Sequence, residues 1–214
     1  MKLFDTKQRI LSFSDPYMRF KLSMNFIFAI AISFVTPIVT YLKGVEFKDI
    51  IWLIPFFAFL GTLVSKNTEF LVKKLTIQQV HKMSLIVTAL FTLTPFLYLW
   101  DGFYTALITS FLAIIDTTLA VVGSIFFTNY VTVKNPLLIS KYQTNRVHVF
   151  ADGAIIGGVL ALLVTKLSNN IIYVMWAEVV VDVCITYLFI INYKLIENLR
   201  EEDYKIKEME DENK

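Results

Sequence analysis

The sequence predicts an all-α, polytopic membrane protein. Of its 214 residues, 56% are hydrophobic and 18% are charged, and the mean hydropathy is +0.62. Soluble chains hold about 45–50% apolar and about 25% charged residues. The apolar residues fall in long blocks, as a bilayer requires. Seven glycines, five prolines and one cysteine exclude collagen-like, disordered and disulfide-rich classes, and a net charge of +2 is too small to indicate a nucleic-acid partner.

Six transmembrane helices are expected from these blocks. They are Phe20–Leu42, Ile50–Ser65, Met83–Trp100, Phe103–Phe127, Val149–Leu167 and Ile171–Tyr193. Each is near the ~20 residues that cross a ~30 Å core, and the second is the shortest. We therefore expect a six-helix domain over residues 20–193, preceded by a cytoplasmic or interfacial segment (1–19) and followed by a charged cytoplasmic tail (194–214). No cleavage site follows the first block, so the leading segment is expected to be retained.

The orientation follows from the distribution of basic residues. Seventeen Lys and Arg fall on one side of the predicted helices, and three, Lys43, Lys48 and Lys166, fall on the other. Because cytoplasmic loops carry the excess of Lys and Arg, both termini are expected in the cytoplasm, with the chain in the plasma (inner) membrane and the lipid bilayer as its first partner. The tail from residue 195 holds eight acids and four bases, which favours a frayed helix or a disordered end.

Four carboxylates fall inside the apolar blocks: Asp116, Asp152, Glu178 and Asp182. An Asp at a helix centre costs roughly 2.5 to 3.5 kcal/mol on insertion scales, so such groups face a cavity, find partners or stay protonated. Glu178 and Asp182, four residues apart, share one helix face. We interpret the four as candidate proton-coupling or cation-binding residues. For Asp152, a structural pairing with Arg146 or Lys141 is an equal alternative, and for all four the competing interpretation is a protonated acid bonded between helices.

Small and polar residues form further stripes. The first block places Asn25, Ser33 and Thr36 on one face, and the fourth adds Thr117. Such a stripe forms either a cavity wall or a close helix contact. Gly153, Gly157 and Gly158 in the fifth block predict a close helix–helix packing surface. Neither histidine has a second ligand at metal spacing, so no metal or cofactor is predicted.

Enzyme signatures are incomplete in this chain. Asp152-Gly153-Ala154 is similar to the start of the CDP-alcohol phosphotransferase motif, but the required Arg and two further aspartates do not follow. A rhomboid-type G-x-S-x-G serine, an H-E-x-x-H pair and a P-loop are also missing from the sequence. We therefore do not expect an enzyme.

The layout resembles the N-terminal six-helix half of a major facilitator superfamily transporter. The first block with its proline, Phe34–Leu42, looks like the first helix of that family. Gly61–Lys66 is similar to the start of the family's G-x-L-x-D-R loop, with Ser65 at the Asp position, and Lys73 and Lys74 stand near its basic cluster. The stretch from Lys141 to Gly158 resembles the fifth helix, without the proline of the drug-antiporter version.

The resemblance implies that helices one and four line a central cavity, so that Ser33, Thr36 and Asp116 are cavity residues. It implies a gate-like loop at Gly61, Lys66, Lys73 and Lys74, and a proton- or cation-coupled carrier of a small molecule or cation. The family uses twelve spans, so a homodimer or a separate second membrane subunit is expected. The alternatives are a truncated remnant, a substrate-binding subunit of an importer, or a non-transporting accessory, immunity or assembly protein.

Overall fold

The computed structural model describes residues 5–40, 68, 70–168 and 170–204, and the regular structure in this part of the chain is helical. The helices are α1 (Thr6–Leu11), α2 (Pro16–Thr40), α5 (Ile77–Phe91), α6 (Thr94–Trp100), α7 (Gly102–Lys134), α8 (Leu138–Ser168), α9 (Ile171–Ile191) and α10 (Tyr193–Glu197), followed by the 3-10 turn η1 (Glu201–Asp203). The expected all-α class is confirmed.

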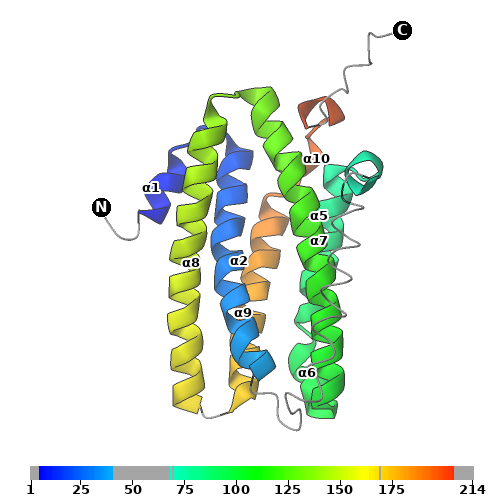
Figure 1. Ribbon diagram of the computed structural model, residues 1–214, viewed down its shortest axis with the longest axis vertical. Helices are drawn as coiled ribbons and strands as arrows, with labels where there is room; N and C mark the ends of the chain where they lie inside the picture. Colours follow the sequence, from blue (N-terminus) through cyan, green and yellow to red (C-terminus); the bar gives the residue numbers. More distant parts are fainter. Residues whose placement is uncertain (1–4, 41–67, 69, 169, 205–214) are drawn as a thin grey trace.

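The long helices stand side by side in one bundle (Figure 1). Helices α2 and α8 make the most extensive contact and run in the same direction, while α7 and α9 run the opposite way. Helix α1, the α7–α8 turn, α10 and η1 lie at one end of the bundle, and the α6–α7 and α8–α9 turns lie at the other. The end of α2 and the start of α5, which come before and after the undescribed residues 41–67, therefore lie at opposite ends of the bundle.

Three described helices are long and apolar enough to cross a membrane: Phe103–Lys134 of α7, Leu138–Ser168 and Ile171–Ile191. Over the described residues the number rises to four if α5 and α6, bent by 40° at their junction, count as one span. These helices associate the chain with a membrane. The three coincide with the last three predicted blocks, although α7 and α8 continue beyond the apolar stretch at their shared turn. The predicted block Ile50–Ser65 lies outside the described residues.

The predicted third span is two helices rather than one. Pro95 stands in the first turn of α6 and has no N–H to donate to the preceding turn. The hydroxyl of Thr94 donates instead to the Phe91 carbonyl at 2.6 Å. The break between α5 and α6 therefore follows from this proline, which lies inside the predicted block Met83–Trp100.

Helix starts carry side-chain caps that the sequence supplies. Thr76 and Gln79 form a reciprocal capping box at α5. Asp101 accepts from the N–H groups of Phe103 and Tyr104 at the start of α7, and Asn170 accepts from the Ile172 N–H at the start of α9. Each cap satisfies donors that the first helical turn leaves unpaired. The starting points of α5, α7 and α9 are therefore determined by the capping residues next to them in the sequence.

Helices α2 and α8 approach closely at two glycines. A Cβ on Gly157 would lie 2.7 Å from the Ile30 carbonyl oxygen, and a Cβ on Gly153 would collide with the Phe26 carbonyl. Ser33 donates to the Ala154 carbonyl at 3.3 Å across the same contact. Gly158 has nothing within 4 Å of such a Cβ. Two of the three predicted packing glycines therefore touch α2, and the third faces away from the bundle.

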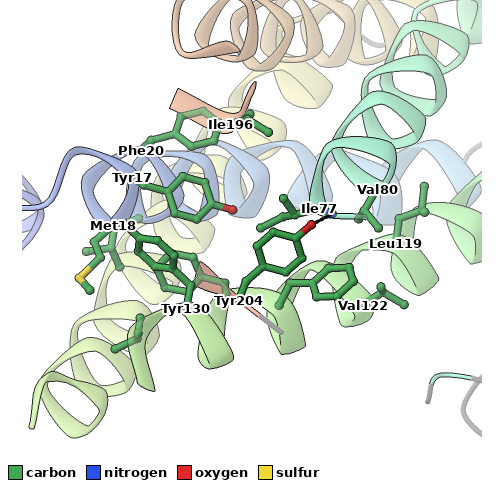
Figure 2. Close-up of a cluster of buried hydrophobic side chains, with 14 of the residues drawn as sticks. Tyr17, Met18, Phe20, Ile77, Val80, Leu119, Val122, Tyr130, Ile196 and Tyr204 are labelled. Atoms are coloured by element: carbon green, nitrogen blue, oxygen red, sulfur yellow. Dashed lines mark hydrogen bonds between the residues drawn. The ribbon is translucent and has the colours of Figure 1, made fainter. Parts of the chain in front are cut away.

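Aromatic side chains fill the end of the bundle at which α10 lies (Figure 2). Tyr204 has 0% exposed surface, lies edge-on to the Phe126 ring at 5.2 Å and accepts a hydrogen bond from the Ile77 N–H at 3.4 Å. Ile196 on α10 is also fully buried. The expectation of a frayed or disordered tail is therefore wrong for residues 195–204, because two apolar anchors among the charges dock this segment onto α5 and α7. Residues 205–214 lie outside the described part.

An ion pair accompanies this docking. Lys134 at the end of α7 lies 3.1 Å from the Asp203 carboxylate. The Arg200 backbone N–H, and then Lys134, hold the pKa of Asp203 below its usual value. A lowered pKa means that this contact is present above the ordinary carboxyl pKa and is lost as the pH falls through the lowered value.

Alanine at the two adjacent glycines of α8 should change stability in opposite directions. Gly157→Ala places a methyl group against the α2 backbone, and we expect it to destabilise the bundle by about 1–3 kcal/mol, because such overpacking moves the backbone. Gly158→Ala meets open space and should stabilise helix α8 by about 0.5–1 kcal/mol. Thermal unfolding of the purified protein in detergent measures both, and equal effects at the two positions would contradict the α2–α8 contact.

Candidate functional site

A cavity of about 170 Å³ lies inside the bundle between α2, α5, α7, α8 and α9. Its wall combines apolar side chains with polar and charged groups. The polar lining consists of Lys21, Asn25, His81, Ser84, Thr88, Asp116, Ser124, Tyr142 and Arg146. An interior hollow of this kind, with convergent polar groups in an apolar wall, is the usual form of a small-molecule site.

Asp116 of α7 lines the cavity and forms no hydrogen bond or ion pair with the described residues. Asp182 of α9 lies behind it with 5% of its surface exposed, and its Oδ2 has no hydrogen-bond partner in the described part. Asp116 and Asp182 interact electrostatically, as do Asp182 and Glu178. Three of the four predicted acids therefore form one series from the cavity into α9.

Two cations face the same cavity. Lys21 comes from the second turn of α2, and its Nζ lies 4.0 Å from the position of a Cβ on Gly123. Arg146 of α8 donates through Nη2 to the Ser124 hydroxyl at 3.3 Å. The two cations are close enough to interact electrostatically, and neither forms an ion pair in the described part of the chain. Two positive charges therefore lie close together on the wall of one small cavity.

The sequence analysis had counted Lys21 and Arg146 among the basic residues that set the orientation, and had also considered Arg146 as a partner of Asp152, but it had assigned neither to a site. Arg146 belongs to α8, which begins at Leu138 and therefore before the predicted block Val149–Leu167, and Lys21 lies near the start of the block Phe20–Leu42 in α2. Both side chains therefore belong to helices and line the cavity instead of a loop. A signal was present: Lys21 stands four residues before Asn25, and Tyr142 stands four residues before Arg146. These spacings put each cation beside a polar neighbour on one helix face.

Hydrogen bonds hold several polar side chains of the cavity wall in place. Asn25 donates to the Tyr142 hydroxyl at 3.5 Å, which links α2 to α8. His81 Nδ1 lies 2.9 Å from the Ile77 carbonyl, so it donates there and leaves Nε2 to accept from Tyr17, 3.4 Å away. The ring is thus bonded on both nitrogens and held in place.

The cavity borders a shallow groove of about 420 Å³ on the outer face of α7 and α8. Ala120, Ser124 and Arg146 line both hollows. The groove also carries Thr117, an exposed residue whose hydroxyl donates to its own helix at Ala113. Thr117 therefore lines this groove rather than the interior.

Other predicted site residues lie elsewhere. Asp152 accepts a 2.6 Å hydrogen bond from the Thr6 hydroxyl of α1, and not from Arg146 or Lys141, which bond to Ser124 and Ser12. Thr6 reaches it because α1 folds back along α8.

The remaining predicted site residues lie in different parts of the structure. Asn25 lines the cavity, whereas Ser33 belongs to the α2–α8 contact. Lys74 lies over the Phe70 ring at 4.6 Å, and Lys73 is exposed. The Thr36 side chain, Gly61 and Lys66 lie outside the described residues.

Comparison with known proteins finds no family model, no curated protein and no solved structure that matches this chain. The resemblance to the major facilitator superfamily therefore stays a prediction, and the site is interpreted from its own geometry.

The border between cavity and groove predicts a difference in water access along α7. In a Cys184→Ser background, which removes the exposed native thiol, Ser124→Cys should react with a charged methanethiosulfonate reagent because both hollows touch it. Val122→Cys, two residues away and fully buried in the aromatic cluster, is the matched control and should stay unmodified. Mass spectrometry of labelled protein measures both, and an inert Ser124→Cys would contradict a hydrated cavity.

Proposed function

We propose that this chain is a six-span membrane carrier for a small solute, coupled to protons through Asp116 and Asp182. The observation that carries the proposal is the polar cavity inside the bundle, with the Asp116 carboxyl on its wall and no partner for it among the described residues. A helix pair that used this acid only for packing would satisfy it with a donor from the facing helix.

Acids that are buried without a partner lower the stability of a helix bundle. A polar group buried without a hydrogen bond costs about 1–3 kcal/mol in proteins, and an uncompensated charge costs more. Asp182 leaves Oδ2 unpaired in the described part, beside Asp116. The bundle gains nothing from these groups as structural links. A role in binding protons, water or a solute accounts for their presence.

The proposed topology has six spans with both termini in the cytoplasm. The end of α2 and the start of α5 lie at opposite ends of the bundle, so a crossing over the predicted block Ile50–Ser65 would join them. Lys134 and Arg200 lie at the end that holds α1 and η1, whereas Lys166 lies in the last turn of α8 at the other end. That distribution supports a cytoplasmic location for the first end.

A second set of helices is part of the proposal. The outer groove of α7 and α8 carries Thr117, Ser124, Thr128, Asn129 and Arg146. Lipid would offer no partner to the Asn129 amide or to the donors of the Arg146 guanidinium that do not bond to Ser124. A second copy of the chain, or a separate membrane subunit, would cover the groove and complete the carrier, as the resemblance to half of a major facilitator transporter implies.

The second candidate function is a non-transporting accessory, immunity or assembly protein. It is favoured by the polar contacts that join α2 to α8, where Asn25 donates to Tyr142 and Ser33 donates to the Ala154 carbonyl. These residues hold helices together. The same explanation does not extend to Asp116, which has no such contact in the described part.

Proton movement in liposomes separates the two functions. We expect purified protein in pyranine-loaded vesicles to change the internal pH when one member of a panel of small acids, amino acids, sugars or cations is added. Asp116→Asn should reduce that flux at least about tenfold, since it removes the proton-binding carboxyl. Asp152→Asn, which alters an acid bonded to Thr6 outside the cavity, is the matched control and should retain it. Equal flux in folded Asp116→Asn and wild-type protein would contradict proton coupling through Asp116.

A further inference from the structure

The charge of the cavity is unbalanced toward positive. Lys21 of α2 and Arg146 of α8 both line it and interact with each other, and neither is ion-paired in the described part of the chain. Like charges that have lost part of their hydration repel one another more strongly than they would in water. An anion between them would remove that repulsion and replace the missing hydration.

Neutral donors surround the two cations. The Ser124 hydroxyl is bonded to Arg146 at 3.3 Å, and the Asn25 amide and Tyr142 hydroxyl lie on the same wall. A guanidinium presents a planar fork of N–H donors that fits two oxygens of one oxyanion, and an ammonium adds a point charge. The set Lys21, Arg146, Ser124, Asn25 and Tyr142 matches a carboxylate or phosphate group.

We infer that this cavity binds the oxyanion group of a small anionic solute, with Lys21 and Arg146 as its principal ligands. Its volume of about 170 Å³ equals that of about five or six water molecules at ~30 Å³ each. This space suits a small carboxylate or phosphate. The inference narrows the substrate class of the proposed carrier and rests on that proposal for transport, although not for binding.

Asp116 gives this site a means of coupling. The charged and titratable groups that face it are Lys21 from α2, His81 from α5, Tyr142 and Arg146 from α8, and Asp182 from α9. When His81 is neutral and Asp116 is protonated, the cavity wall has a net charge of +2 from Lys21 and Arg146. When Asp116 is ionised, the net charge falls to +1. A proton on Asp116 therefore strengthens anion binding, and by reciprocity the anion strengthens proton binding.

Two sources could supply the oxyanion. A free solute would enter from water, whereas a phospholipid headgroup could reach Arg146 through the outer groove of α7 and α8. The inner hollow beyond Ser124 favours the free solute, because Lys21 and Asn25 line this hollow and not the groove. The experiment below includes an arm for each source.

The test is calorimetric binding to the full-length protein in an uncharged detergent. Phosphate, acetate and succinate are titrated as sodium salts, with sodium chloride and glucose as controls. We expect at least one oxyanion to bind and glucose not to bind. Lys21→Gln and Arg146→Gln should each weaken that binding about tenfold or more, because each removes a charge-assisted contact. Lys82→Gln removes an exposed charge one residue beyond His81 and should leave the affinity unchanged.

A conservative variant guards against misfolding. Arg146→Lys keeps the charge but loses the fork, and we expect an affinity between those of wild type and Arg146→Gln. No oxyanion binding, or binding that is unchanged in Lys21→Gln and Arg146→Lys, would overturn the inference. Binding of phosphatidylglycerol micelles without binding of any free oxyanion would also overturn it and would assign a headgroup.

This outcome is separable from that of the proposed function. Proton-coupled flux of a neutral or cationic solute, with no oxyanion binding, would leave the carrier standing and remove the anion site. Oxyanion binding that depends on Lys21, with no flux of the bound anion in liposomes, would leave the site standing and remove the carrier.

Discussion

The cost of placing charge in an apolar medium governs the arrangement of this bundle. Lys21, Arg146 and Asp116 meet at one internal hollow, where water or a solute can solvate them. Asp152, unlike the predicted acid Asp116, accepts a hydrogen bond, which comes from Thr6 of α1. Asp116 and Lys21, which have no partner in the described part of the chain, therefore lie on the cavity wall, where Arg146 retains a hydrogen bond to Ser124.

The glycine contact between α2 and α8 lies next to that cavity along the same two helices. Arg146, Gly153 and Gly157 stand seven and four residues apart, so all three share the face of α8 that meets α2. Because Gly153 and Gly157 bring the α8 backbone against Phe26 and Ile30, the helices are held close just below Arg146. On the N-terminal side of this contact, Lys21 and Asn25 of α2 and Tyr142 and Arg146 of α8 line the cavity. The packing contact and the cavity are therefore neighbours along the same two helices.

The sequence predicted the helical class, the last three spans and the acids that lie together, since long apolar blocks and isolated charges within them depend only on local composition. It missed three features that depend on distant contacts. Lys21 and Arg146 were counted among the basic residues of the cytoplasmic side, because hydropathy cannot tell an inward-facing cation from a solvated one. The burial of Tyr204 was not predicted, because the residues around it in the tail are mostly charged. The Thr6 partner of Asp152 lies 146 positions away in sequence, so no local pattern could have revealed it.

The proposed function requires that Asp116 and Lys21 contact water or a solute in this cavity and are not sealed between helices. The most direct measurement is a high-resolution electron cryomicroscopy map of the protein in lipid nanodiscs, inspected for ordered density within hydrogen-bond distance of Asp116 and Lys21. The account predicts discrete water or anion density at both groups and an open space between α2, α7 and α8. A closed seam, in which Asp116 is bonded directly to a neighbouring helix and no solvent density is present, would contradict it.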